Sequence, residues 1–299
     1  MARLASPGAE PCRLRLRGVL LLDLGPVPDF VAAGYCPRRH AGAVAVLLED
    51  REVVRALLFR EPIRNATVIH RTFNHPDFSL AFADRVPNPL AVLALKASDH
   101  PAAPHQFALH ATDTVAALHV LSAVPPGFAL YHVADELAFP AINKRLRVGW
   151  WGEAIYYAMD AKDFRDDQAH ETALLDPIYA ERVAKVWAPD WPATGYVRSR
   201  IENGLSAAIY VQGEPVAWYL THLETDHVVM LGFLHVLDAH RRKGYARSLS
   251  CAMIRQALAR GKTPACHVYT DNEPSIRLME SLGFRRVCTQ AWGDGVSPG

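Results

Sequence analysis

A short basic loop ending in glycine is the part of the chain with the clearest chemical character. Residues 241–244 read Arg-Arg-Lys-Gly, and a fourth cation, Arg247, follows within one helical turn. An apolar run, 228–236, precedes the loop, and a segment with helical periodicity, 246–260, follows it. Backbone amides at the start of a helix attract anions, and nearby cations add to that attraction. The sequence therefore predicts a site for a ligand that carries several phosphates.

The overall composition limits the classes of partner. The chain has 299 residues, of which 50% are hydrophobic, and this fits one large domain or two of ordinary size. Lys and Arg number 32 against 31 for Asp and Glu, so the whole chain has almost no net charge. We therefore expect neither nucleic acid nor an anionic membrane surface as a partner. No apolar run approaches the roughly 18 residues that span a bilayer.

The cysteines and the first residues bear on the compartment. Five cysteines form no Cys-x-x-Cys pair and leave an odd count, which is typical of a reducing interior. We expect a cytoplasmic protein, with the mitochondrial matrix as the alternative because the first residues are rich in arginine. The alternation from Arg13 to Arg17 predicts a first strand instead. No Cys and His spacing suggests zinc, and no metal is expected.

The chain divides at its most charged and least apolar stretch, residues 160–171. We predict an N-terminal α/β domain over 1–165 and a catalytic, ligand-binding domain over 166–299. The expected elements of the first domain are a hairpin at 42–48 and 53–59, strands at 90–95 and 107–110, and helices at 112–121 and 133–146.

The second domain has a clearer pattern, with helices followed by antiparallel strands and then by alternating strands and helices. This order predicts a mixed α/β sheet, so the fold class is α/β (α+β mixed sheet). Its expected elements are helices at 177–186 and 196–203, a hairpin at 206–212 and 215–222, the strand 228–236, the helix 246–260, a strand at 267–270, a helix from 272 to 282 and a last strand at 284–289.

Two motifs in this second domain resemble the signatures of the GNAT superfamily of acyl-CoA N-acyltransferases. The first, R/Q-x-x-G-x-G/A, corresponds to the stretch from Arg241 to Ala246. The second begins with Asn272 and Ser275 and ends at the Leu-Gly-Phe that contains Gly283. The pair occurs at the usual separation with the expected elements between. The resemblance implies a GNAT fold in the C-terminal half, and we interpret the strands of the N-terminal half as a degenerate GNAT-like domain.

A narrower likeness is to the glycine N-acyltransferases and their relatives. It rests on the stretch from Gly213 to Trp218 and on His267-Val268. It implies that an acyl group, acetyl or larger, moves from acyl-CoA to the amine of a small molecule, expected to be an amino acid. The alternatives are a protein lysine or N-terminal acetyltransferase and a non-catalytic regulatory module that binds acyl-CoA. We expect a monomer or a homodimer.

The resemblance implies where coenzyme A (CoA) binds. Its pyrophosphate is expected on the amides of 242–247 and its pantetheine along the strand edge at 234–236. Neither a Gly-Lys-Ser/Thr sequence nor a G-x-G-x-x-G pattern is present, which disfavours ATP and NAD. The expected CoA-binding residues are Leu234, His235, Val236, Arg241, Arg242, Lys243, Gly244, Tyr245, Ala246, Arg247, Asn272 and Ser275.

An amine that attacks a thioester must lose a proton, and a free α-amino group has a pKa of about 8. A general base is therefore expected. The resemblance puts an acidic base near Asp226, and His235 and His267 are the other candidates. A backbone N–H of His235 or Val236 is expected to donate to the thioester oxygen as negative charge develops.

The leaving thiolate and the acceptor pocket have weaker candidates. Met279 stands where many members of the superfamily have a proton-donating tyrosine. Either CoA leaves as a thiolate, or another group donates the proton, for which Ser275 and Tyr269 are the candidates. Arg198 and Arg200 are candidates for binding an acceptor carboxylate, or else are exposed arginines of a helix. Cys251 lies on an apolar helix face, and we expect direct transfer without an acyl-enzyme.

Overall fold

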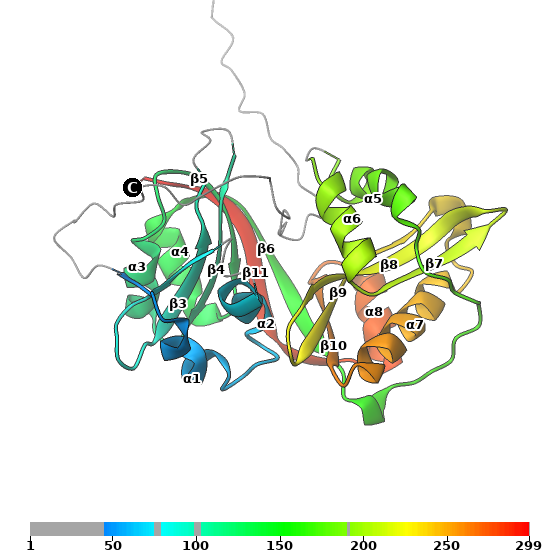
Figure 1. The fold of residues 1–299 in the computed structure, drawn as a ribbon, viewed down its shortest axis with the longest axis horizontal. Coiled ribbons are helices and arrows are strands. Elements are labelled where there is room, and N and C mark those ends of the chain that lie inside the picture. Colours follow the sequence, from blue (N-terminus) through cyan, green and yellow to red (C-terminus); the bar gives the residue numbers. More distant parts are fainter. Residues whose placement is uncertain (1–44, 75–78, 99–102, 190–191, 299) are drawn as a thin grey trace, which may run out of the picture.

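The computed structural model describes residues 45–74, 79–98, 103–189 and 192–298. Within them, eleven strands form one continuous mixed sheet in the order β1-β2-β3-β4-β5-β11-β6-β10-β9-β8-β7 (Figure 1). The predicted mixed α/β fold class is confirmed. The strand expected near Arg13 lies outside the described residues.

The N-terminal half supplies one side of the sheet. Its strands are β1 (Val46–Leu47), β2 (Leu80–Ala83), β3 (Ala91–Lys96), β4 (His105–Ala111), β5 (Gly127–Val133) and β6 (Arg147–Ala158). Its α-helices are α1 (Arg55–Leu58), α2 (Ala66–Ile69), α3 (Thr114–Leu121) and α4 (Phe139–Arg145). Neighbouring strands β1 to β4 run antiparallel, and β4 and β5 run parallel.

The C-terminal half supplies the other side. Its strands are β7 (Ser206–Val211), β8 (Glu214–Glu224), β9 (Val228–Val236), β10 (Thr263–Tyr269) and β11 (Arg285–Ser297). Its α-helices are α5 (Ala180–Trp187), α6 (Thr194–Asn203), α7 (Tyr245–Ala259) and α8 (Glu273–Leu282). Strands β7 to β9 run antiparallel, and β9 and β10 run parallel.

The two halves repeat one order of elements: three antiparallel strands, a helix, a strand parallel to the third, a second helix and a long last strand. The two last strands, β6 and β11, pair antiparallel in the middle of the sheet. Each of them also pairs with the other half, because β11 lies beside β5 and β6 lies beside β10. Each half therefore contributes its last strand to the other half, and Figure 1 shows these two strands, red β11 and green β6, side by side between the halves.

Helices pack apolar side chains against both faces of the C-terminal part of the sheet. On one face, Leu249, Met253 and Ile254 of α7 are fully buried among residues of β7 to β10. On the other face, α5 and α6 pack around Trp218, which is 1% exposed. This arrangement is the one that an amphipathic helix requires, because its apolar stripe must leave water. None of the described helices is both long enough and apolar enough to cross a membrane.

Most of the wrong predictions fall in the N-terminal half, although β10 begins earlier than expected, at Thr263, and β11 extends further, to Ser297. The expected strand over 53–59 is helical, because the Asp50 carboxylate accepts from the Glu52 amide and begins a helical turn there. The expected helix over 133–146 is shorter, since β5 extends to Val133 and α4 begins at Phe139 with Pro140 in its first turn. The strands β2, β5 and β6 were not predicted at all.

Candidate functional site

The predicted basic loop connects β9 to α7, as expected. It contains a 3₁₀ turn, Asp238–His240, and two residues with left-handed backbone, Arg242 at φ +60° and Gly244 at φ +82°. Gly244 is the N-cap of α7 and offers no side chain to the helix amides. The first amides of a fifteen-residue helix are therefore left for an anion, which such a helix end attracts.

The charges of the loop face outward. Arg242 and Lys243 are exposed, as is Arg241. The Arg241 guanidinium pairs with the Asp238 carboxylate at 2.8 Å and also donates to the Val236 carbonyl. The loop therefore presents two exposed cations, Arg242 and Lys243, beside the helix start.

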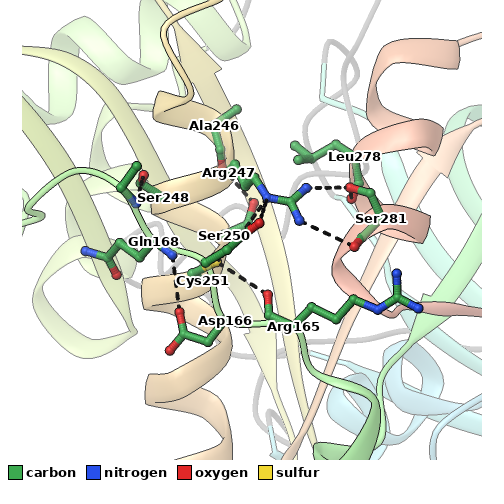
Figure 2. Close-up of polar contacts among 12 residues, drawn as sticks. Arg165, Asp166, Gln168, Ala246, Arg247, Ser248, Ser250, Cys251, Leu278 and Ser281 are labelled. Atoms are coloured by element: carbon green, nitrogen blue, oxygen red, sulfur yellow. Dashed lines mark hydrogen bonds and ion pairs between the residues drawn. The ribbon is translucent and has the colours of Figure 1, made fainter.

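The fourth cation has a different place. The Arg247 guanidinium donates to the Asp167 carboxylate at 2.6 Å and to the Ser281 hydroxyl at 2.7 Å, so it joins α7 to α8 (Figure 2). The hydrogen bond from Arg247 holds the pKa of Asp167 below its ordinary value. The Arg247 side chain is thus committed to the fold, and only its backbone amide remains for the ligand.

Residues 165–170, which we call the strap, run along α7 and fix its first turn. The Ser248 hydroxyl accepts from the Ala169 and His170 amides at 3.2 and 3.1 Å. The His170 ring donates from Nε2 to the Lys243 carbonyl at 2.7 Å. The strap therefore holds the loop from the side, and it is a part of the site that sequence reasoning missed. The sequence signal for the strap was the acidic pair Asp166-Asp167. These carboxylates form ion pairs with Arg255 and Arg247, but we interpreted the pair only as part of a charged boundary.

The strand before the loop separates from its parallel neighbour. Pairing between β9 and β10 ends at Leu231 with Cys266, and β9 continues for five further residues. At this point Phe233 has φ +63°, and the register of β9 against β8 shifts. This bulge turns the strand and leaves the edge at 234–236 without a partner in β10. An extended ligand can therefore pair with this edge.

The corresponding place in the N-terminal half lacks these features. Only two residues connect β4 to α3, and the Asp113 carboxylate accepts from the Ala116 amide at 2.9 Å. A carboxylate at the helix start both occupies the amides and repels an anion. Pairing of β4 with β5 continues as far as Leu109 with Val133. Among its described residues, the first half therefore has the same order of elements but lacks an uncapped helix start at this position.

The structure does not bring Asp226 together with the other candidate bases. Asp226 is exposed in the turn before β9. It precedes His235 by nine residues, and an extended strand of that length separates the two residues by about 30 Å. His235 lies beside the loop, with its ring stacked on Trp218 at 5.0 Å between centroids. Burial, and then the Arg241 charge, lower the pKa of His235.

His267 lies on β10, one residue beyond its last pair with β9. Its ring stacks on Tyr156 at 4.6 Å, and its Nε2 lies 2.8 Å from the Gln290 side-chain oxygen. Burial lowers the pKa of His267 well below its ordinary value. Two residues further on, burial raises the pKa of Tyr269, so this phenol keeps its proton at neutral pH.

The remaining candidates have structural contacts. The Asn272 side chain accepts from the Ser275 amide at 3.3 Å and caps α8, and Met279 is buried in the core. On α6, Arg198 faces Glu202 at 4.0 Å, whereas the Arg200 guanidinium lies over the Tyr196 ring at 5.6 Å. Among the described residues, no group of three His, Cys, Asp or Glu side chains is placed to hold a metal ion.

Comparison with known proteins identifies this architecture. A family model described as FR47-like protein matches residues 209–293. A Drosophila protein covers 86% of this chain and 99% of its own at 16% identity, with a TM-score of 0.63. A putative acetyltransferase of the GNAT family from Novosphingobium aromaticivorans covers 77% and 96% at 19% identity, with a TM-score of 0.52. A tandem GNAT protein from the clavulanic acid biosynthesis pathway covers 86% and 98% at 12% identity, with a TM-score of 0.52.

The chain therefore has the GNAT acetyltransferase fold. The fold that we predicted from the two motifs is confirmed, and the repeated order of elements makes the N-terminal half a second, GNAT-like copy. The narrower likeness to glycine N-acyltransferases, the division at residue 165 and the roles of the site residues stay predictions.

Proposed function

We propose that the protein is an acyl-CoA-dependent N-acyltransferase that transfers an acyl group directly to the amine of a small molecule, with an amino acid as the expected acceptor. One observation carries the proposal. The uncapped start of α7 and the edge of β9 that β10 leaves unpaired lie at the same end of the sheet, whereas the corresponding helix α3 of the N-terminal half is capped by Asp113. The first suits a diphosphate and the second suits the amide groups of pantetheine.

The chemistry follows from these positions. With the diphosphate on the amides of 242–247 and the pantetheine along 234–236, the thioester lies where β9 and β10 separate. A backbone N–H of His235 or Val236 would stabilise the developing oxyanion. His267 is at the β10 side of this point and Tyr269 follows it. The protonated Tyr269 phenol is then the better of the two candidate donors to the leaving thiolate, because Ser275 is at the start of α8.

A screen of acyl-CoA donors against amines tests this function. Acetyl-CoA and longer acyl-CoA thioesters are mixed with amino acids, simple amines and a peptide with a free N-terminus, and free thiol is measured. We expect thiol release with at least one small amine above the rate without amine. Tight CoA binding without thiol release for any amine would instead identify a regulatory acyl-CoA-binding protein. Preference for the peptide would identify a protein acetyltransferase.

A further inference from the structure

A buried cluster at the seam between the two halves is not used by the CoA site. It lies on the sheet face opposite α7 and α8. There the side chains of four neighbouring central strands meet: His132 of β5, Gln290 of β11, Tyr156 of β6 and His267 of β10. Cys266 and Val268, on either side of His267, point into the core under α7, so His267 points to the other face.

The orientation of Gln290 is fixed by carbonyl groups, which can only accept hydrogen bonds. Its amide nitrogen lies 2.8 Å from the Arg64 carbonyl and 3.5 Å from the Ala134 carbonyl, so the NH₂ group must point toward them. Its oxygen therefore points the other way, toward His132 and His267. Arg64 lies two residues before α2, next to its N-cap Asn65, so the N-terminal half sets this orientation.

The same oxygen determines the tautomer of both histidines. Nε2 of His132 lies 2.9 Å and Nε2 of His267 lies 2.8 Å from the Gln290 oxygen. An amide oxygen only accepts, so each ring donates from Nε2–H. Burial lowers the pKa of both rings, and each ring is therefore neutral at pH 7. In each neutral ring the unprotonated nitrogen is then Nδ1.

The two Nδ1 atoms have different surroundings. The Nδ1 of His132 is buried with no hydrogen-bond partner among the described residues, and His132 is fully buried. The buried Tyr269 hydroxyl is likewise without such a partner. Buried polar groups are nearly always satisfied, so these atoms indicate that a small polar molecule belongs on this face. His267 as a whole residue is less buried than His132, and it stands where β9 and β10 separate.

We infer that this cluster is the acceptor subsite. The unprotonated Nδ1 of the neutral His267 ring accepts a hydrogen bond from the amine. Gln290 is a positioning residue, because it fixes the tautomer in which Nδ1 is unprotonated. The inference rests on the proposed function. In the reaction, the amine nitrogen forms a bond to the thioester carbon and the carbon–sulfur bond breaks. The amine proton passes to Nδ1 of His267, and CoA leaves as a thiolate that takes a proton from Tyr269 or from water.

The inference assigns a role to the N-terminal half. Its helix α3, which corresponds to α7, has a capped start, yet this half supplies His132 and the Arg64 carbonyl that orients Gln290. It also covers the neighbouring part of the same face, because the Tyr156 hydroxyl donates to the Ile63 carbonyl at 2.7 Å. The N-terminal half thus completes the acceptor side of the C-terminal half.

Nitrogen NMR of the full chain, labelled at its histidines, tests the subsite without relying on turnover. Long-range proton–nitrogen correlations identify which ring nitrogen is protonated. We expect Nε2–H tautomers for both His132 and His267 at pH 7, assigned with His132→Asn and His267→Gln, with His119→Gln on α3 as the control. Phenylalaninamide, an amine probe with an α-amino pKa of about 8, should shift the Nδ1 signal of His267 in the CoA-loaded protein. An Nδ1–H tautomer of His267, or an unmoved Nδ1 signal, would overturn the inference.

Kinetics of Gln290→Leu separate positioning from folding. We expect kcat/KM for the amine to fall by about tenfold to a hundredfold, by analogy with the groups that orient metal-binding histidines, while the Kd for CoA stays unchanged. Gln290→Glu keeps an accepting oxygen and should recover part of the loss. Unchanged kinetics in Gln290→Leu would contradict the positioning role. Absence of thiol release by the wild type with every amine would reject the proposed function, and the NMR result would still decide whether the subsite exists.

Discussion

At the scale of single residues, the neutral state of the buried histidines has a thermodynamic consequence. Burial lowers the pKa of His132 to about 3. Burial also lowers the pKa of His267, and this effect is larger than the opposite effect of the hydrogen bond to Gln290. In the unfolded chain both rings have a pKa near 6.5. Between that value and the folded pKa, the unfolded state binds more protons. The contribution of these rings to stability is therefore complete above pH 6.5 and is lost as the pH falls.

We predict that the free energy of unfolding falls below pH 6.5 by about 1.4 kcal/mol per pH unit for each such histidine. His267→Gln removes one of these titrations, so its stability should depend less steeply on pH, although its stability at pH 7.5 is lower. Urea unfolding of both proteins at several pH values from 7.5 to 5 measures this. Parallel curves for the wild type and the variant would show that His267 is not buried in its neutral form.

At the scale of elements, the cations around α7 divide into two kinds. Arg242 and Lys243 are exposed at the loop, whereas Arg247 holds α7 against Ser281 of α8 and Asp167 of the strap. We predict that Arg242→Ala and Lys243→Ala each weaken CoA binding about fivefold, by loss of a charge near a phosphate, and leave the melting temperature unchanged. Arg247→Ala should lower the melting temperature with a smaller effect on CoA affinity. Equal losses of CoA affinity in all three would place the Arg247 side chain on the ligand instead.

The elements also show which parts of the structure were readable from the sequence. The loop, α7 and α8 were predicted because glycine at a positive φ, an Asn272 cap and an apolar stripe are local signals. The strand β6 was missed because its residues 147–153 combine exposed or partly exposed side chains with two glycines and lack simple alternation. The strap and the Gln290 cluster could not be predicted, since they join residues far apart in the chain. Gln290 and Arg64, for example, are separated by 226 positions.

At the scale of the whole molecule, the exchange of last strands makes each half depend on the other. In the sheet, β6 lies between β10 and β11 and pairs with both. The predicted division at residue 165 would put β6 on one fragment and its two partners on the other. The sheet of residues 166–299 alone would therefore lack the strand that joins β10 to β11.

We predict that the fragment 166–299 shows no cooperative thermal unfolding and no CoA binding, and that co-expression with 1–165 restores both. Far-UV circular dichroism on heating measures the first, and retention of the untagged fragment by a tagged partner measures the assembly. A fragment 166–299 that unfolds cooperatively on its own would show that the second half is an independent domain.

The central claim is that the amides at the start of α7 bind the diphosphate of CoA, and calorimetric titration of CoA tests it most directly. Gly244→Asp puts a carboxylate on these amides, and Gly213→Asp is a matched control because Gly213, in the β7–β8 turn, has a similar φ of +85° and open space around it. We predict that the wild type and Gly213→Asp bind CoA with the same Kd and that Gly244→Asp gives no measurable heat. Equal CoA affinity in all three proteins would contradict the account.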